Sequence, residues 1–173
     1  AQPCLSSRVE TGIAIDPVDD KIYWANFYKE THYTTGSTFF EFVRSWPGIP
    51  DNVIDIGCGD GRDSYAFARA GRDVTGLDRA EIGVQHASKK ALEVVGGDKA
   101  RFFACDVGEA DDFRRIVEQV RADHGGQSIL FYSRFFLHSI TAETQRTMLT
   151  VLSEVSRPGD AFAAEFRTDR DAL

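Results

Sequence analysis

Short apolar runs alternate with longer segments of helical period from about residue 52 onward. The apolar runs predict strands at 53–56, 73–77, 101–104, 128–132 and 161–166, and the longer segments predict helices at 61–70, 80–95, 109–123 and 142–155. Glycine residues that typically end a helix follow each predicted helix, at Gly71, Gly96-Gly97, Gly125-Gly126 and Pro158-Gly159. This strict alternation is typical of an α/β fold with a mostly parallel sheet.

Right-handed crossovers between such strands place helices on both faces of the sheet, which predicts a three-layer, doubly wound architecture. Ligands of these sheets bind beyond the carboxyl ends of the strands, where the strand order reverses. The residues that follow the first four predicted strands are 57–61, Asp78, Cys105-Asp106 and 133–138. We expect these four segments to share one crevice.

The first fifty residues have a different pattern, rich in aromatic side chains. These are Trp24, Phe27, Tyr28, His32, Tyr33, Phe39, Phe40, Phe42 and Trp46. A helix is predicted near 37–45, where Ser37 or Thr38 can act as the N-cap. We therefore divide the chain into an aromatic-rich helical cap at 1–50 and a sheet domain at 51–173, within one structural domain. The cap is either an extra layer on the sheet or a cover over the crevice.

Composition and charge exclude several classes of protein. The 173 residues are enough for one domain, and 27 acidic against 20 basic residues give a formal net charge of −7. No basic run exceeds two residues, which argues against a nucleic acid or an anionic membrane as partner. No stretch of about 20 apolar residues and no signal peptide is present, so we expect a cytoplasmic protein without membrane insertion. Cys4, Cys58 and Cys105 form no ligand cluster, so we expect reduced thiols and no metal site.

The most informative run is Val53 to Arg62, which contains a GxGxG turn directly after a predicted strand. A dinucleotide fingerprint requires GxGxxG, whereas Arg62 stands at the place of the third glycine. Asp55, two residues before the first glycine, would repel a pyrophosphate but would attract an ammonium group. The pattern therefore disfavours a nicotinamide-dependent oxidoreductase, which stays as an alternative.

This run, with Asp63-Ser64 after it, resembles motif I of the class I S-adenosylmethionine-dependent methyltransferases. It is most similar to their small-molecule branch, which includes tellurite-resistance, thiopurine-type and polysaccharide-associated enzymes. The resemblance extends over about residues 52–167 and implies S-adenosylmethionine as cofactor and S-adenosylhomocysteine as product. The cofactor contacts that it implies are Asp55, Gly57, Cys58, Gly59, Gly61, Asp78, Arg79, Asp106, Val107 and Ser133.

Two of these contacts have specific roles in the resemblance, and each also has a structural alternative. Asp78 corresponds to the acid that accepts both ribose hydroxyls, and Asp106 to the acid that accepts from the adenine amino group. Either side chain could instead be the N-cap of the helix that follows it. The occurrence of both acids in the expected order after successive strands favours the cofactor.

The fourth predicted strand continues into Phe131 to His138, which resembles motif IV, beside the methyl acceptor. His138 is a candidate base for a hydroxyl acceptor, or a residue that caps or packs beside the next helix. Arg134 is a candidate clamp for a phosphate or carboxylate, or a salt-bridge partner of Asp60 or Glu165. We expect methyl transfer by in-line displacement to a small polar acceptor, most favourably an oxygen of a sugar or glycan-linked group. The alternative from another class is a catalytically silent module that binds the cofactor without turnover.

Class I methyltransferases typically have seven strands, whereas this chain ends soon after its fifth predicted strand. The fifth strand would then be an uncovered edge, which natural proteins usually avoid. Either the last two strands lie in a C-terminal segment outside this sequence, or a neighbouring chain such as the second copy in a homodimer covers the edge. We favour the first interpretation.

Overall fold

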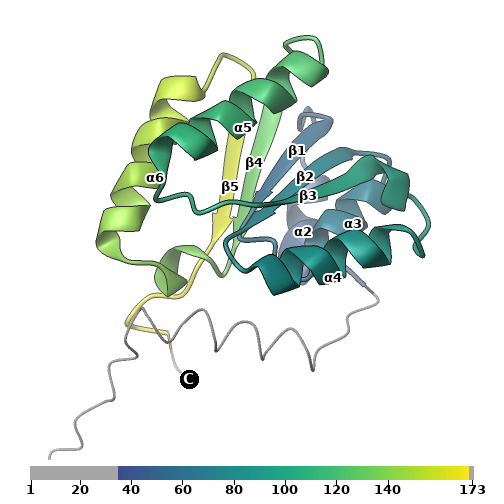
Figure 1. Ribbon diagram of the computed structural model, residues 1–173, viewed down its shortest axis with the longest axis horizontal. Coiled ribbons are helices and arrows are strands. Elements are labelled where there is room, and N and C mark those ends of the chain that lie inside the picture. The colour runs from purple at the N-terminus through teal and green to yellow at the C-terminus, as the bar shows by residue number, and fades with distance from the viewer. Residues whose placement is uncertain (1–34, 172–173) are drawn as a thin grey trace, which may run out of the picture.

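The computed structural model describes residues 35–171, which contain one parallel sheet of five strands (Figure 1). The strands are β1 (Asn52–Ile56), β2 (Asp73–Asp78), β3 (Ala100–Ala104), β4 (Ile129–Arg134) and β5 (Ala161–Glu165). Their order in the sheet is β3-β2-β1-β4-β5, and every neighbouring pair is parallel. The predicted α/β fold of the doubly wound type is confirmed.

Helix α2 (Thr38–Arg44) precedes β1, and the later helices connect the strands in strict alternation. The connecting helices are α3 (Arg62–Arg69), α4 (Glu81–Ala91), α5 (Ala110–Asp123) and α6 (Ala142–Val155), with short 3-10 turns η1 (Gly97–Lys99) and η2 (Leu137–Ser139). The clearest difference from the prediction is the end of α4, which stops at Ala91 rather than near 95. The N–H groups of Leu92 and Glu93 donate three residues back, so the helix tightens before Gly96, whose φ is 78°.

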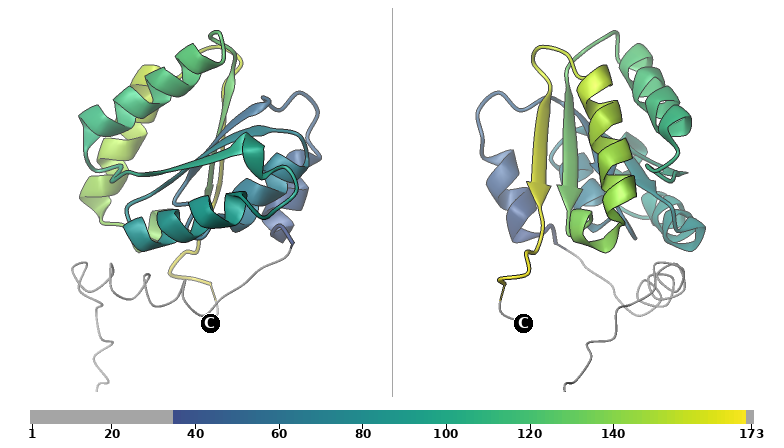
Figure 2. Two further views of the ribbon diagram at one scale, coloured as in Figure 1. Left: turned by 45° about the vertical axis from the view of Figure 1, so that its right-hand side comes forward. Right: turned by 90° about the vertical axis from the view of Figure 1, so that its left-hand side faces the viewer.

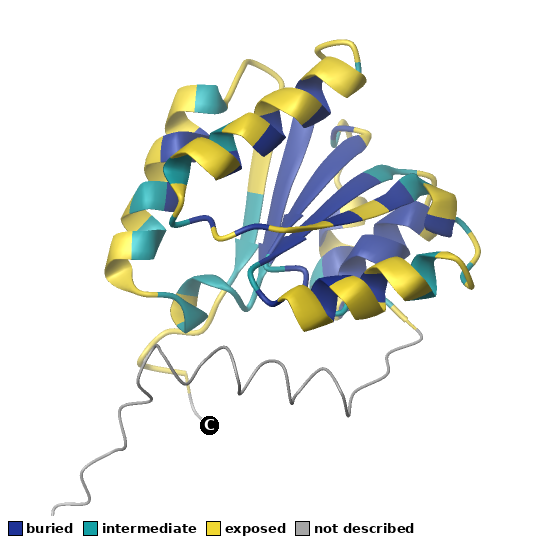
Figure 3. Cartoon of the chain, in the orientation of Figure 1, coloured by how far each residue is buried: buried dark blue, intermediate teal, exposed yellow. Residues whose placement is uncertain are grey.

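Alternate strand residues build two separate hydrophobic cores, one on each face of the sheet. Val53, Val74 and Leu130 belong to the core that α2, α3 and α4 cover, whereas Ile54, Leu77 and Phe131 belong to the core under α5 and α6. Figure 2 shows the two sets of helices on opposite sides of the strands, and Figure 3 shows that β1, β2 and β4 are buried between them. Successive strand side chains point to opposite faces of the sheet, and helices cover both faces, which gives the three predicted layers.

Helix α2 confirms the predicted helix near 37–45 and packs beside α3, in the same layer as α3 and α4. Its N-cap is Ser37, whose hydroxyl accepts from the N–H of Phe40 at 3.0 Å. Phe40 is buried and packs edge-to-face on Phe67 of α3, with ring centroids 4.8 Å apart. The other predicted cap aromatics, from Trp24 to Tyr33, lie outside the described residues.

The two edges of the sheet are both partly open. At one edge, the side chains of Phe162 in β5 and Phe166 just after it are 45% and 50% exposed, as expected for an edge strand. At the other edge, a surface hollow lies between α4 and β3 and is lined in part by Ala91, Val94 and Phe103. None of the predicted site residues lines that hollow.

Candidate functional site

The strand order reverses between β1 and β4. The loops that follow β1, β2, β3 and β4 all lie at the carboxyl end of the parallel strands (Figure 1). This is the place where ligands of doubly wound sheets bind. Segments 57–61, Asp78, 105–106 and 133–138 all lie at this carboxyl end of the sheet, and that they share one crevice stays a prediction.

The glycine turn after β1 requires its glycines because its backbone is left-handed at three positions. The φ angles of Gly57, Gly59 and Gly61 are 76°, 57° and 84°. A Cβ at Gly57 would lie 2.3 Å from a ring carbon of Phe136, so the loops after β1 and β4 are in close contact. The N–H groups of Gly57 and Cys58 both donate to the carbonyl of Leu77, which attaches the turn to β2.

Asp78 lies at the end of β2 and reaches directly to the glycine turn. Its Oδ2 accepts from the N–H of Gly59 at 2.9 Å, and its Oδ1 accepts from the N–H of Ala80 at 2.8 Å. Helix α4 begins at Glu81 with Ala80 as its N-cap, so the interpretation of Asp78 as the N-cap is wrong. Each carboxylate oxygen has a second lone pair, which suits the paired hydroxyls of a ribose.

Asp106 follows β3 and is exposed beside the same edge. Its Oδ1 accepts from the N–H of Gly108 at 2.9 Å. Helix α5 begins at Ala110 with Glu109 as its N-cap, so Asp106 is not a helix cap either. The next residue, Val107, is buried, whereas Arg79 beside Asp78 is half-buried. The carboxylate of Asp106 is therefore open to a donor from solvent or from a ligand.

Asp55 is a buried carboxyl group inside β1, 3% exposed. The hydroxyl of Ser64 donates to its Oδ2 at 2.6 Å. Burial, together with the carboxylates of Asp63 and Asp78, raises the pKa of Asp55 to about 7, although the Ser64 hydrogen bond and Arg134 act in the opposite direction. A cation placed at this carboxyl group would favour its ionised form.

Cys58 and Cys105 are free, as predicted, and both are buried. Burial raises the pKa of both thiols, and the nearby carboxylate of Asp55 adds to the effect at Cys58. The pKa of Cys105 rises to about 11. Neither thiol ionises near neutral pH, so both act as small apolar side chains.

Ser133 near the end of β4 has a buried hydroxyl without a partner. The residue is 1% exposed, and its Oγ is the one buried side-chain polar atom among residues 35–171 that makes no hydrogen bond. An unpaired buried hydroxyl costs about 1–3 kcal/mol. A ligand that bonds to this hydroxyl would remove the cost, and the predicted role of Ser133 as a cofactor contact fits this observation.

We expect Ser133→Ala to stabilise the ligand-free protein by about 1 kcal/mol, because the substitution removes an unpaired polar atom. The measurement is the free energy of unfolding in urea. Ser139→Ala is the matched control, because the Ser139 hydroxyl donates to the carbonyl of Phe136 and its loss should not stabilise. A loss of stability in Ser133→Ala would contradict the assignment of an unpaired hydroxyl.

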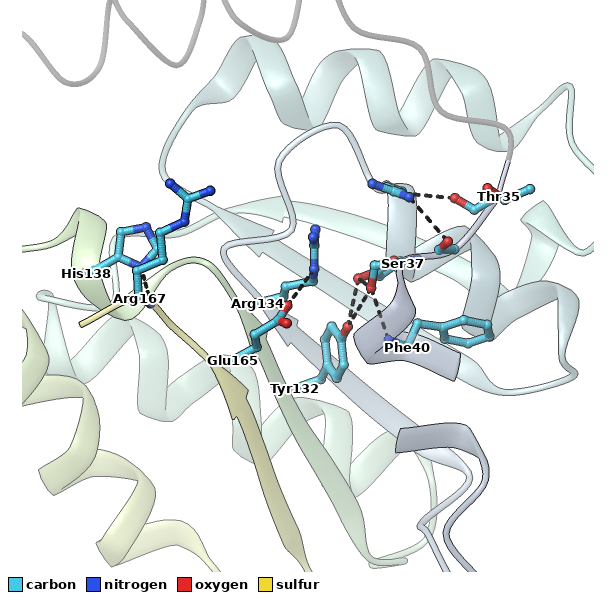
Figure 4. A network of polar contacts seen from close by, with 11 residues as sticks. Thr35, Ser37, Phe40, Tyr132, Arg134, His138, Glu165 and Arg167 are labelled. Carbon is cyan, nitrogen blue, oxygen red and sulfur yellow. Dashed lines mark hydrogen bonds and ion pairs between the residues drawn. The ribbon is translucent and has the colours of Figure 1, made fainter. Parts of the chain in front are cut away.

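The two candidate acceptor residues lie at and just after the end of β4, Arg134 as its last residue and His138 in η2 (Figure 4). Arg134 forms an ion pair with Glu165, with Nε and Oε2 2.8 Å apart, so the salt bridge proposed as its alternative role is present. His138 lies in η2, and its Nδ1 accepts from the backbone N–H of Arg167 at 3.2 Å. Helix α6 has Thr141 as its N-cap, so His138 does not cap it.

The hydrogen bond at Nδ1 decides which ring nitrogen of His138 carries the proton. Burial and the nearby Arg167 lower the pKa of His138 below its usual 6.5, so the ring is neutral at pH 7.5. Because Nδ1 accepts, the proton of the neutral ring is on Nε2. His138 is therefore a hydrogen-bond donor through Nε2 in this arrangement.

A buried network around Asp63 was not predicted. The Asp63 carboxylate accepts from the N–H and the hydroxyl of Ser37 and from the hydroxyl of Tyr132, each at 2.7 Å (Figure 4). Beside it, the Arg62 guanidinium donates to the carbonyls of Thr35 and Gly36. These bonds attach the start of α2 to the first turn of α3, immediately after the glycine turn.

The comparison with known families is decisive. A model described as a methyltransferase domain matches residues 53–159. This chain belongs to the methyltransferase domain family. The predicted resemblance to class I S-adenosylmethionine-dependent methyltransferases is thereby confirmed at the level of the family.

Individual relatives of this methyltransferase domain match only part of their own length. A ubiquinone biosynthesis O-methyltransferase from Bordetella avium is 37% identical over 76 residues, which are 43% of this chain and 26% of that protein. The chain thus spans about a quarter of the curated relatives that it matches.

Solved structures share the fold of this methyltransferase domain at low sequence identity. The glycopeptide N-methyltransferase MtfA has a TM-score of 0.59 at 15% identity, over 80% of this chain and 52% of that chain. The protein in a DhpI-SAM-HEP complex has a TM-score of 0.61 at 14% identity, over 92% of this chain and 70% of that chain. MtfA is known in complexes with S-adenosylmethionine and with S-adenosylhomocysteine.

Two further findings concern residues 35–171 of the methyltransferase domain. No helix in this part of the chain is both long and apolar enough to span a membrane. The same residues contain no group of three or more His, Cys, Asp or Glu side chains arranged to hold a metal ion.

Proposed function

We propose that this chain binds S-adenosylmethionine and catalyses methyl transfer by in-line displacement to a small polar acceptor, leaving S-adenosylhomocysteine. The most favoured acceptor is an oxygen of a sugar or glycan-linked group. The observation that carries the proposal is the hydrogen bond from the Gly59 N–H to Asp78, because it joins the glycine turn to the predicted ribose-binding acid.

The residues at the strand ends fit this cofactor by their chemistry. Asp78 would accept the ribose hydroxyls, Asp106 the adenine amino group, and Asp55 the ammonium group. The backbone of Gly57, Cys58, Gly59 and Gly61 would allow a close approach, since the glycines carry no Cβ. Arg79, Val107 and Ser133 would complete the contacts, and Ser133 has the unpaired hydroxyl.

When bound, S-adenosylmethionine supplies an electrophilic methyl group. The chain would contribute orientation, which can account for about 7–11 kcal/mol of the barrier in a well-aligned displacement. Arg134 would orient the acceptor. His138 would take the proton of a hydroxyl acceptor on Nδ1, which requires the hydrogen bond from the Arg167 N–H to open first.

Calorimetry with S-adenosylhomocysteine tests this proposal. Saturable binding is expected, and Asp78→Asn should weaken it about tenfold, because it replaces the carboxylate that accepts the ribose hydroxyls. Asp112→Asn is the matched control, since Asp112 is an exposed carboxylate on α5. Absence of binding by the folded wild-type protein would refute the proposal, and equal effects of the two variants would remove Asp78 from it.

The second candidate function is a catalytically silent module that binds the cofactor without turnover. It is favoured by the hydrogen bond at His138 Nδ1, which occupies the atom that would have to accept a proton. A labelled methyl donor offered with a broad panel of acceptors separates the two functions. Cofactor binding without transfer to any acceptor would favour the silent module. Family membership displaces the nicotinamide-dependent alternative.

A further inference from the structure

The turn after β4 contains a strained residue, Phe135. Its φ of 52° makes it the sole non-glycine residue with a positive φ among residues 35–171. A left-handed conformation costs a phenylalanine roughly 1–2 kcal/mol, and such strain persists where the surroundings enforce it, often at functional sites. Its N–H donates to the carbonyl of Glu165 at 2.7 Å, which holds the turn against β5.

This conformation places the Phe135 ring among three polar side chains. The guanidinium carbon of Arg134 lies 4.3 Å from the ring centroid, and that of Arg167 lies 5.4 Å from it. The His138 ring packs edge-on against the same ring, with centroids 5.9 Å apart. Two cations from the ends of β4 and β5 thus share one aromatic ring, although like charges repel each other.

One carboxylate compensates part of this charge. Glu165 accepts from Arg134 through Nε, which leaves the Nη groups of Arg134 without a partner among the described residues. Asp171 also lies close enough to favour protonation of His138, but its Oδ2 accepts from the N–H of Thr168. The guanidinium of Arg167 forms no hydrogen bond or ion pair within the described part of the chain, and the residue is exposed.

We propose that Arg134, Arg167 and the Nε2–H of His138 bind an ionised carboxylate or phosphate group on the methyl acceptor. Figure 4 shows both guanidinium groups beyond the ends of β4 and β5, with the His138 ring beside Arg167. Guanidinium groups pair with planar or tetrahedral oxyanions through two hydrogen bonds, and a neutral imidazole adds one donor. The acceptor is thus an acidic small molecule, such as a sugar acid or a sugar phosphate. This inference rests on the proposed function, because it assigns the anion to the methyl acceptor. Its test measures anion binding by itself.

The test is an NMR titration of the histidine ring signals with inorganic phosphate, in the presence and absence of S-adenosylhomocysteine. A saturable shift of the His138 signals is expected, while those of His86 and His124 stay in place. We expect Arg167→Gln to weaken phosphate binding about tenfold or more. Arg115→Gln should leave it unchanged, because Arg115 is an exposed arginine on α5.

Phe135→Gly is a second variant that relieves the backbone strain, since glycine adopts the same φ without strain. It removes the ring that both guanidinium groups share, so phosphate binding should again weaken. Glucuronate and glucose 6-phosphate should each bind more tightly than glucose at the same signals, and their relative affinities distinguish a carboxylate from a phosphate. Equal binding of glucose, no saturable shift with phosphate, or unchanged affinity in Arg167→Gln would each overturn the proposal.

The design separates this proposal from the proposed function. S-adenosylhomocysteine binding is measured on the same samples by calorimetry. If it fails while phosphate binds through Arg167, the anion site stands and the methyltransferase proposal falls. If S-adenosylhomocysteine binds while phosphate does not, the methyltransferase proposal stands and the anion site falls.

Discussion

Replacing Asp55 with asparagine is expected to stabilise the fold at pH 8 and, at the same time, to weaken binding of the cofactor. Asp55 is 3% exposed and has carboxylates as neighbours, so its ionised form is costly. Asparagine has nearly the same shape, still accepts from the Ser64 hydroxyl, and has no charge to bury. The gain in stability and the loss of binding come from the same missing charge.

The pH dependence of this effect follows from the raised pKa. The folded state keeps the Asp55 proton up to about pH 7, whereas the usual value for the side chain is 3.8. The folded state therefore binds more protons than the unfolded state in this window, and wild-type stability falls as pH rises from about 4 to about 7. The full difference corresponds to about 4 kcal/mol. Asp55→Asn should equal the wild type near pH 4 and exceed it by a few kcal/mol at pH 8.

Urea denaturation at several pH values measures this difference between variant and wild type. Asp112→Asn on α5 is the control, because its carboxylate is exposed and its removal should not change the pH dependence. Calorimetry of S-adenosylmethionine on the same proteins should show wild-type affinity rising between pH 6 and 8, and no such rise in Asp55→Asn. Parallel stability curves for Asp55→Asn and the wild type would show that the pKa of Asp55 does not differ between the folded and unfolded states.

Local sequence signals account for most of the fold and for the glycine turn. The five strands are short apolar runs with glycine or proline nearby, and their apolar residues lie on both faces because helices cover both. The turn from Gly57 to Gly61 could be predicted because left-handed backbone at three positions requires glycine. Asp78 could be placed beside it because neighbouring parallel strands end at the same edge.

Contacts between distant residues could not be predicted in this way. The hydrogen bond between His138 and Arg167 joins residues 29 positions apart, and it changes which ring nitrogen of His138 is protonated. The positive φ of Phe135 goes against the preference of its side chain, so no local rule indicates it. The contacts among the proposed acceptor residues therefore emerge only from the structure, whereas the proposed cofactor contacts come from the motifs and stay a prediction.

Replacing Asp63 with alanine should be the most destabilising of the substitutions considered, at about 3–5 kcal/mol. The substitution removes the shared acceptor of three buried donors, namely the N–H and hydroxyl of Ser37 and the hydroxyl of Tyr132, and leaves the two hydroxyls, 3.4 Å apart, with only each other. Burial raises the pKa of Tyr132, so its phenol stays protonated and remains a buried donor in the variant. Tyr132→Phe removes one donor of the three and should cost about 1 kcal/mol.

The same network joins α2 to the helix that follows the glycine turn, so its loss should reach the proposed cofactor site. In a Trp24→Phe background, Trp46 is the remaining tryptophan and reports on the end of α2, where its ring packs against Phe42. We expect Asp63→Ala to change Trp46 fluorescence at low urea and to weaken S-adenosylhomocysteine binding. Ser45→Ala is the matched control, because it removes an exposed hydroxyl at the other end of α2 and should change stability by less than about 0.5 kcal/mol.

If Asp63→Ala and Tyr132→Phe cost the same, the carboxylate is not the centre of the network. If binding is unchanged in a destabilised but folded Asp63→Ala, α2 and the glycine turn are independent of each other.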